Sequence, residues 1–593
     1  MSHPAGPSSA RSAIETSPRS SHAAVGNAWA FATGVLVVIG LVFRWMKLGS
    51  LSLWFDEGYT AWITSNSWLA ILHYIRADTA PPLYYITLQS WTQIFGNSEW
   101  GLRSLSAAAS TTTIFVVWAT ADRCLRSGFA RFIAVSLVAL SSMQIEFAQE
   151  ARSYALLALF EAVTIYFIVR RVEGGGFGFV LAATACQVAA VYTQNIMLFY
   201  GVAIFAAWCV WPVPGNPTTR LRPAARRRLW HRRGLETRLC VRDAAIAGSI
   251  VLLLYIPWVP TLIQQARAVG SSFWVAPPAR RDVSDLATAM FGTQAYWELI
   301  VLIDKYRVGS RELMHWCSLL AGGGLMAHAL FARKRQAAAL MVCAWLPIYF
   351  GIIYSCWKTS IFLPKAFIAS IPPIALLLAL PADAMLDGSP QAGGQRPVQR
   401  LRRRLVRSLS FTAIVVLFLL LVPTLIGYVM DHKKENWRSA GQFVAALPPQ
   451  VRLIEFDAND GQPTFDYYYN RYRNTSEPRP AESGVPNGFF DNRPPRAMQR
   501  VLSLSDLAGL RRQLTSGKFA EIDLVLSHRD WADPETLSLI YMKTHARLIP
   551  MPDGQTHWES PDNQVAVWRF RVPLTAATRS TTRPTTTRST PLR

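Results

Sequence analysis

Apolar stretches follow one another along the first 430 residues and alternate with short polar or basic segments. A helix needs about 20 apolar residues to cross a hydrocarbon core, and most of these stretches approach that length. The pattern predicts a mainly α protein, a polytopic helical membrane bundle with about eleven transmembrane helices, and it excludes a soluble enzyme. The predicted spans are residues 28–46, 102–120, 132–143, 155–169, 177–192, 197–211, 244–263, 313–331, 337–355, 367–380 and 409–430.

Three segments predicted outside the membrane are too long to be simple turns between spans: residues 47–100, residues 267–312 and the C-terminal region from residue 431. Residues 47–100 are rich in tryptophan and contain a short amphipathic helical stretch at 82–95, which suits the membrane interface. Residues 431–574 alternate apolar strands at 451–456, 522–527 and 565–572 with helical stretches near 437–447 and 504–514. We therefore expect a membrane domain at 28–430 followed by a small α/β domain at 431–574.

The ends of the chain differ from both domains in composition. Residues 1–27 are rich in Ser, Pro and Ala, and residues 575–593 consist almost wholly of Thr, Arg, Pro and Ser. Such segments have too little apolar surface to form a core, so we expect two disordered tails. Residues 1–26 lack the pattern of a cleaved signal peptide, so the first span is expected to remain as an anchor.

Composition and charge refine this picture. Hydrophobic residues make up 51% of the 593 residues and charged residues only 16%. The net charge is +23, and most of it falls in alternate loops of the membrane domain, near residues 123–131, 170–171, 220–242, 333–335 and 396–407. Arginine and lysine gather on the cytoplasmic side of membrane proteins. The charge therefore indicates topology rather than nucleic-acid binding: the amino terminus lies inside and the α/β domain lies outside.

The seven cysteines lie in spans or at their ends and form no close pair or Cys/His cluster. This argues against a disulfide framework or a structural zinc site.

The most informative candidates for chemistry are Asp56 and Glu57, two adjacent carboxylates just beyond the first span in an aromatic frame. Burial at the membrane boundary raises the pKa of a carboxyl group and suits it to general-base catalysis. The alternative is that both are solvated loop acids, and their spacing alone does not decide between the two.

Four cations are expected at the outer boundary: Arg44, Arg103, Arg152 and Lys365. Ionisable residues at membrane depth usually face a cavity or one another, so these side chains could hold an anionic phosphate. The alternatives are structural pairs, Glu99 with Arg103 and Glu150 with Arg152, and an Arg44 that extends its guanidinium to the interface.

Several short motifs stand in a characteristic order along the chain. The motifs span residues 28–470. They are Asp56-Glu57, Pro81-Pro82-Leu83-Tyr84-Tyr85, Phe95-Gly96 through Arg103, Gln149-Glu150-Ala151-Arg152-Ser153-Tyr154, and Lys434-Glu435-Asn436-Trp437-Arg438.

In this order, the motifs resemble those of the GT-C glycosyltransferases, in the bacterial branch related to protein O-mannosyltransferases and lipid A aminoarabinose transferases. The resemblance implies a GT-C-type fold and transfer of a sugar from a polyprenyl-phosphate donor to an acceptor hydroxyl outside the bacterial cytoplasmic membrane. The acceptor would be a glycan, a lipid or a protein, and the transfer a single inverting displacement. Asp56 matches the acid assigned as base in this family. The residues expected to line the substrate pocket are Tyr59, Asp78, Tyr84, Tyr85, Glu150, Tyr154 and Gln194.

Three positions depart from the family pattern. Relatives often carry His where this chain has Ala80 and Gln194, which leaves the acceptor and the use of a divalent metal open. Lys365 replaces an arginine and loses its bidentate fork.

Two other classes remain from the sequence. A transporter would also have many spans, but it should show paired halves or broken helices at the midplane, and no internal repeat is visible. A non-catalytic scaffold or sensor would leave Asp56 and Glu57 without a role.

Overall fold

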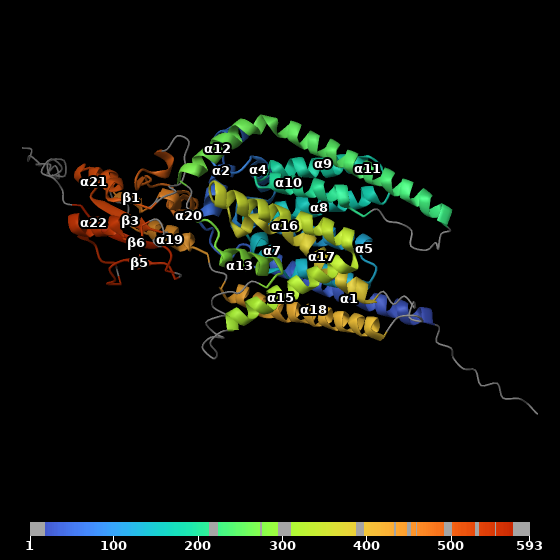
Figure 1. Ribbon diagram of the computed structural model, residues 1–593. Helices are drawn as coiled ribbons and strands as arrows, with labels where there is room; N and C mark the ends of the chain where they lie inside the picture. Colours follow the sequence, from blue (N-terminus) through green and yellow to red (C-terminus); the bar gives the residue numbers. More distant parts are fainter. Residues whose placement is uncertain are drawn as a thin grey trace, which may run out of the picture.

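The computed structural model describes residues 18–212, 223–272, 275–293, 310–386, 397–431, 434–447, 452–457, 459–491, 501–527, 533–551, 553–561 and 563–572. The described chain forms a long helical bundle with a smaller α/β domain at one end (Figure 1). The predicted tail 575–593 and residues 1–17 lie outside the described residues. Residues 18–27 are already helical, so the first helix begins before the predicted boundary.

Each predicted span falls on a bundle helix or on a helix and its direct continuation. The bundle helices are α1 (Pro18–Trp45), α5 (Glu99–Cys124), α6 (Gly128–Ala139), α7 (Ser142–Glu146), α8 (Tyr154–Val172), α9 (Gly178–Val191), α10 (Met197–Val210), α11 (Pro223–Tyr255), α12 (Val259–Ser272), α15 (Ser310–Ala332), α16 (Lys334–Trp357), α17 (Ile371–Leu386) and α18 (Pro397–Asp431).

Six helices among the described residues are long and apolar enough to cross a membrane, or seven if the bent pair of α6 with the α7 segment is one span. Helices α9 and α10 have 14 residues each, which is about 21 Å of helix at 1.5 Å per residue. They are too short to span a core of about 30 Å alone. The protein is therefore a multi-pass membrane protein, while the count of eleven crossings stays a prediction.

The arginine-rich loops meet at one end of the bundle. Asp383 at the end of α17 accepts hydrogen bonds from the backbone N–H groups of Arg126 and Ser127, each at 2.8 Å, and it pairs with Arg333. Arg171 in the last turn of α8 pairs with Asp243 of α11 at 2.7 Å. These contacts join loops that the charge pattern assigns to the same side of the membrane.

Three short helices lie at the opposite end, in the segment after α1: α2 (Phe55–Thr64), α3 (Trp68–Ile75) and α4 (Leu83–Phe95). The amphipathic stretch predicted at 82–95 is α4. It ends at Gly96, whose φ of 78° lies in the left-handed region that glycine adopts without strain. Ser98 then caps α5 by accepting a hydrogen bond from the N–H of Gly101.

The C-terminal domain is built on one mixed sheet in the order β2-β1-β3-β6-β4, with β5 also pairing with β6. Strand β1 runs parallel to β2 and β3, and β6 runs antiparallel to β3, β4 and β5. The strands are β1 (Arg452–Asp457), β2 (Ala481–Gly484), β3 (Glu521–Leu526), β4 (Arg547–Leu548), β5 (Trp558–Glu559) and β6 (Ala566–Arg571). The helices are α19 (Trp437–Ala445), α20 (Gln462–Tyr472), α21 (Ala508–Thr515) and α22 (Leu537–His545).

Each of the three predicted strands matches one of these strands to within two residues at either end. The small α/β domain that the sequence predicts is present.

Helix α20 attaches this domain to α2. The backbone N–H of Leu53 donates to the hydroxyl of Tyr468 at 2.7 Å, and the hydroxyl of Thr464 donates to the carbonyl of Phe55 at 3.3 Å. Gly58 faces Thr464 so closely that a Cβ there would lie 1.9 Å from Thr464 Oγ1. The domain therefore rests directly on the helix that carries Asp56 and Glu57.

Replacing Gly58 with alanine should destabilise this contact by about 1–3 kcal/mol, because α20 must shift to make room for the methyl group. A thermal melt of the purified protein measures the change. Gly34→Ala is the matched control, since nothing lies within 4 Å of that Cβ position in α1. A Gly58→Ala protein as stable as Gly34→Ala would contradict the packing described.

Cysteine labelling tests the predicted orientation. In a background without native cysteines, Ser516→Cys in the α/β domain should react with a membrane-impermeant thiol reagent in intact cells. Gly176→Cys, in an exposed turn between α8 and α9, should react only after the membrane is opened. The reverse pattern would overturn the orientation.

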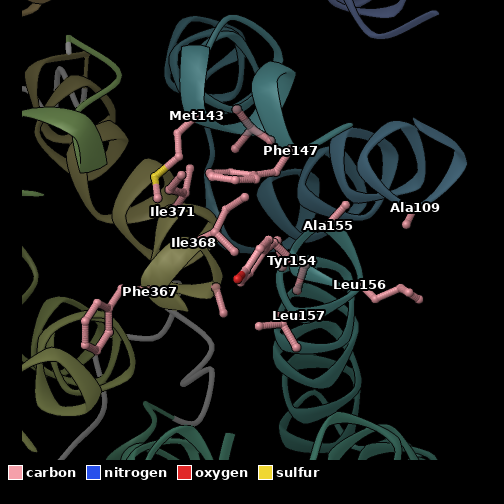
Figure 2. Packing of buried hydrophobic residues seen from close by; sticks show 14 of the residues in the cluster. Ala109, Met143, Phe147, Tyr154, Ala155, Leu156, Leu157, Phe367, Ile368 and Ile371 are labelled. Atoms are coloured by element: carbon pink, nitrogen blue, oxygen red, sulfur yellow. The ribbon is translucent and has the colours of Figure 1, made fainter. Parts of the chain in front are cut away.

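The bundle has a continuous apolar core that reaches the site. Tyr154 at the start of α8 packs edge-on against Phe147, with ring centroids 5.0 Å apart. Figure 2 shows Ile368 beside Phe147 and Tyr154, while Phe367, the residue before Ile368 in the short helix Pro364–Ser370, lies apart from them. The segments that carry Arg152 and Lys365 are therefore held in place by packing against this core.

Candidate active site

Asp56 and Glu57 lie in the first turn of α2, where a negative charge is favoured by the helix dipole. The N-cap residue is Trp54, and its backbone N–H lies 3.4 Å from the carboxylate of Glu57. This is one half of a capping box, the contact from Glu at the third helical position back to the N-cap; the Trp54 side chain makes no capping hydrogen bond. This contact turns Glu57 back toward the start of the helix, away from the direction that Asp56 takes.

Glu57 is completely buried and is held by Arg103 from α5. Arg103 donates from Nε to Oε1 at 2.8 Å and from Nη2 to Oε2 at 2.6 Å. Its remaining donors bind the carbonyls of Leu48, Leu51 and Ser52. A guanidinium has five N–H donors, and all five of Arg103 are occupied by protein acceptors.

Two more groups complete the surroundings of Glu57. The N–H of Ala151 donates to Oε1 at 2.8 Å, and Nζ of Lys434 lies 3.2 Å from Oε2. Burial alone would raise the pKa of the Glu57 carboxyl, but Arg103 and Lys434 outweigh it and lower the pKa to about 2. Glu57 is thus a buried, ionised carboxylate that joins three separate segments of the chain.

Asp56 has a different environment. Its Oδ2 lies 3.6 Å from Nη2 of Arg152 and 3.6 Å from Nζ of Lys365, and its side chain is 19% exposed. Both cations come from outside α2, Arg152 from the segment before α8 and Lys365 from the short helix Pro364–Ser370. At 3.6 Å neither is a close hydrogen bond, so the carboxylate keeps room for another partner.

Aromatic rings surround these two cations. Nζ of Lys365 lies 5.3 Å from the centre of the Trp54 ring and 5.4 Å from that of Tyr154. The guanidinium of Arg152 lies 6.0 Å from the Tyr154 ring. These separations are typical of cation–π contacts, which keep both positive charges in place without occupying their hydrogen-bond donors.

A second group of predicted pocket residues lies around Asp78. The hydroxyl of Tyr85 donates to Asp78 Oδ2 at 3.1 Å. Burial raises the pKa of the Asp78 carboxyl, and it raises that of Tyr59, which interacts with both Asp78 and Asp56. Tyr84 is buried, and its hydroxyl has no hydrogen-bond partner among the described residues.

Glu150 and Gln194 lie on the side of Arg152. Glu150 Oε1 is 3.9 Å from Nζ of Lys434, while Oε2 is buried without a hydrogen-bond partner in the described part of the chain. Burial raises the pKa of this carboxyl. Gln194 donates to the hydroxyl of Ser153 at 2.9 Å, so it meets the residue that follows Arg152.

Arg44 does not belong to this group. It is completely buried and donates to Ser110 Oγ at 2.8 Å and to the carbonyls of Gly40, Val138 and Ala139. Two of these carbonyls end α6, so Arg44 caps that helix and ties it to α1. The expectation that Arg44 and Arg103 bind a phosphate is corrected, because protein acceptors take four donors of Arg44 and all five of Arg103.

The sequence reasoning gave no role to Lys434 or Trp54. Lys434 lies in a motif that carried the resemblance, and Trp54 lies in the aromatic frame around Asp56 and Glu57, so the signal was present. Glu435 of the same motif accepts hydrogen bonds from the N–H of Phe55 at 3.1 Å and from the indole of Trp437 at 2.6 Å. The motif at 434–438 therefore contacts and stabilises the first turn of α2, although the two segments are about 380 residues apart in sequence.

Within the described ranges, no three His, Cys, Asp or Glu side chains lie close enough together to hold a metal ion.

Comparisons with known proteins agree with this fold. Residues 79–222 match the family model described as dolichyl-phosphate-mannose-protein mannosyltransferase. The apo crystal structure of ArnT from Cupriavidus metallidurans superposes with a TM-score of 0.52 at 15% identity, covering 92% of this chain and 98% of that one. No match was found among curated protein sequences.

Two further solved structures resemble it less closely. ArnT from Cupriavidus metallidurans bound to undecaprenyl phosphate has a TM-score of 0.49 at 13% identity, over 92% of this chain and 98% of that one. The Archaeoglobus fulgidus oligosaccharyltransferase tethered with an acceptor peptide has a TM-score of 0.46 at 11% identity, over 92% and 74%.

The helical bundle with its outer short helices and terminal α/β domain has the GT-C fold of membrane glycosyltransferases. Within that class, the chain is similar to the dolichyl-phosphate-mannose-protein mannosyltransferases and to ArnT. The fold class predicted from the sequence is confirmed.

Proposed function

We propose that this protein transfers a sugar from a polyprenyl-phosphate donor to an acceptor hydroxyl at the outer face of the bacterial cytoplasmic membrane. One observation carries the proposal. Asp56 is partly exposed at the end of the bundle, and two cations from other segments lie 3.6 Å from its Oδ2. A general base next to groups that bind a phosphate is what displacement of a lipid phosphate requires.

The step balances with these residues alone. Asp56 takes the proton of the acceptor hydroxyl as that oxygen forms a bond to the anomeric carbon. The bond between that carbon and the phosphate oxygen breaks, and its electron pair leaves with the polyprenyl phosphate. Attack from the face opposite the phosphate inverts the anomeric centre. The matched family is described as using dolichyl-phosphate-mannose, which supports a donor of this lipid-phosphate class.

Arg152 and Lys365 are the cations assigned to the donor phosphate. Both have donors that are not committed to strong protein acceptors: Arg152 contacts the carbonyl of Asp56 at 3.5 Å and Thr60 Oγ1 at 3.4 Å. As negative charge develops on the leaving phosphate, these cations stabilise it. Glu57 has only protein partners, so we assign it as a positioning residue that fixes the first turn of α2.

Neutralising Arg152 or Lys365 should weaken use of the donor. Arg152→Gln and Lys365→Gln each remove one charged hydrogen bond to the phosphate, a loss of about 1.5–3 kcal/mol, or roughly 10- to 150-fold. Kinetics at varied donor concentration measure this effect, and the apparent affinity for the acceptor should change less. Lys358→Gln, an exposed lysine after α16, is the control. Unaltered donor dependence in both variants would make them structural cations.

Radiolabelled sugar transfer tests the function itself. The full chain, purified and reconstituted in sealed liposomes, is supplied with a polyprenyl-phosphate-linked sugar and an envelope extract as acceptor source. We expect donor-dependent transfer of the label. Movement of the intact donor across the bilayer without transfer would favour a transporter, and neither activity would favour a scaffold.

A further inference from the structure

A large cleft lies between the outer helices and the α/β domain, beside the catalytic residues rather than among them. Its volume is about 1110 Å³. One wall is formed by α2, α4 and the start of α5, and the other by α20, β2 and the segment at Phe490. Neither Asp56 nor its two cations line it.

The cleft is polar, and its formal charges balance. Arg479 pairs with Asp466 and Glu482, so these three side chains hold one another in place with a net charge of −1, and Arg471, the other cation in the lining, offsets it. Arg471 lies 3.9 Å from the centre of the Tyr467 ring and donates to the carbonyl of Asn97 at 2.9 Å. A strongly charged ligand would therefore gain little electrostatic binding free energy in this cleft.

Two amides in the cleft have capacity to spare. Gln93 on α4 and Asn470 on α20 are exposed, line opposite walls, and make no side-chain hydrogen bond to the described residues. Each amide offers two donors and an acceptor with two lone pairs. They can therefore bind a ligand that carries several hydroxyl groups.

Aromatic rings accompany these amides. Trp62 lies 5.5 Å from Phe490 and 5.4 Å from Phe489, measured between ring centroids. Trp62 and Phe490 line the cleft, and both are partly exposed. Flat apolar faces next to amides suit the alternating C–H and O–H surfaces of sugar rings, as in ligand pockets where aromatic walls accompany a few polar groups.

The cleft also adjoins the catalytic region. Tyr59 and Trp62 lie on successive turns of α2 with ring centroids 5.9 Å apart, and Phe489 contacts both. Trp62 is six residues after Asp56, which is about 9 Å along the helix axis. A ligand seated in the cleft can extend along α2 toward Asp56.

We propose that this cleft binds the carbohydrate part of the acceptor, an uncharged oligosaccharide whose end reaches Asp56. The inference rests on the proposed function for the identity of the ligand as acceptor, while the binding itself does not depend on catalysis. A glycan acceptor is favoured over a peptide because the two free amides and the exposed rings require no charged or terminal group on the ligand.

Direct binding tests this assignment. The full chain in nanodiscs is applied to a microarray of neutral and acidic bacterial oligosaccharides with synthetic peptides beside them, and the dissociation constant of each retained glycan is measured. We expect neutral oligosaccharides to bind. The variant carrying Gln93→Leu and Asn470→Leu should bind about 5- to 150-fold more weakly, which corresponds to two lost neutral hydrogen bonds.

Gln442→Leu is the matched control, since Gln442 is an exposed amide on α19 outside the cleft. It should bind like the unaltered protein. Retention of peptides alone, no retained glycan, or equal affinity in the cleft variant and the control would overturn the assignment. Donor-dependent transfer without glycan binding contradicts the cleft alone, whereas glycan binding without any transfer contradicts the proposed function alone.

Discussion

Asp56→Asn should lower the turnover of sugar transfer by about 10²–10⁴-fold, the usual contribution of a general base. The amide keeps the shape of the carboxylate but cannot accept the acceptor's proton. Donor binding should persist, because Arg152 and Lys365 supply the contacts assigned to the phosphate. Transfer rate and donor binding measured on the same samples separate the two effects.

Asp122→Asn is the control for this variant, since Asp122 is an exposed acid near the end of α5 that pairs with Arg131 of α6 at the other end of the bundle. Its turnover should match that of the unaltered protein. Near-normal turnover in Asp56→Asn would remove the assignment, and the base would have to be sought at Glu57, Asp78 or Glu150.

Glu57→Gln should mainly destabilise the protein, by about 3–5 kcal/mol, because it leaves the buried charges of Arg103 and Lys434 without their carboxylate. Turnover should fall less than in Asp56→Asn once the folded fraction is taken into account, since Glu57 positions α2 and touches no substrate. Chemical or thermal denaturation of the purified variant measures the loss.

The control for Glu57 is Glu173→Gln. Glu173 pairs with Arg123 at 2.7 Å, but both side chains are well exposed, 28% and 36%. Such surface pairs contribute about 0–1 kcal/mol. Equal stability of the two variants would show that the buried contacts of Glu57 do not stabilise the folded protein.

The pH dependence of stability follows from the same carboxylate. Its pKa falls from 4.5 to about 2 on folding, so the unfolded chain binds this proton more readily. The contribution of Glu57 is therefore complete above pH 4.5 and is lost as the pH falls toward 2. Glu57→Gln should flatten this part of the stability profile.

Much of the bundle could be predicted from hydropathy, because an apolar stretch in a membrane has few alternatives to a helix. The helix positions at 102–120 and 337–355 fall inside α5 and α16. The number of membrane crossings is harder to predict from the sequence. Helices α9 and α10 are apolar but short, and apolarity alone does not distinguish a full span from a partial one.

The site was predictable as a set of motifs but not as a geometry. Asp56 and Glu57 are neighbours in sequence, but their side chains take different directions. Glu57 turns back toward the N-cap and binds Arg103. Asp56 lies near Arg152 and Lys365. Which acid turns inward depends on side-chain direction, which spacing does not reveal. For the same reason the sequence suggested that Arg103 binds a phosphate. In the structure its N–H donors are used by backbone carbonyls, those of Leu48, Leu51 and Ser52, and by Glu57.

Long-range contacts explain the rest of what sequence reasoning missed. Lys434 reaches Glu57 from the segment between α18 and α19, and no local pattern predicts that approach. The resemblance singled out 434–438 as a motif but did not place it next to Glu57.

Proton NMR of the anomeric centre tests directly whether the protein transfers the sugar with inversion of its configuration. The full chain in nanodiscs is given a polyprenyl-phosphate sugar of known anomeric configuration and an acceptor that supports transfer, and the anomeric signals are followed in time. Inverting transfer with Asp56 as base predicts loss of the donor signal with matching appearance of a product of opposite configuration, and neither change in Asp56→Asn. A donor signal that persists with the unaltered protein, or a product that retains the donor's configuration, would contradict it.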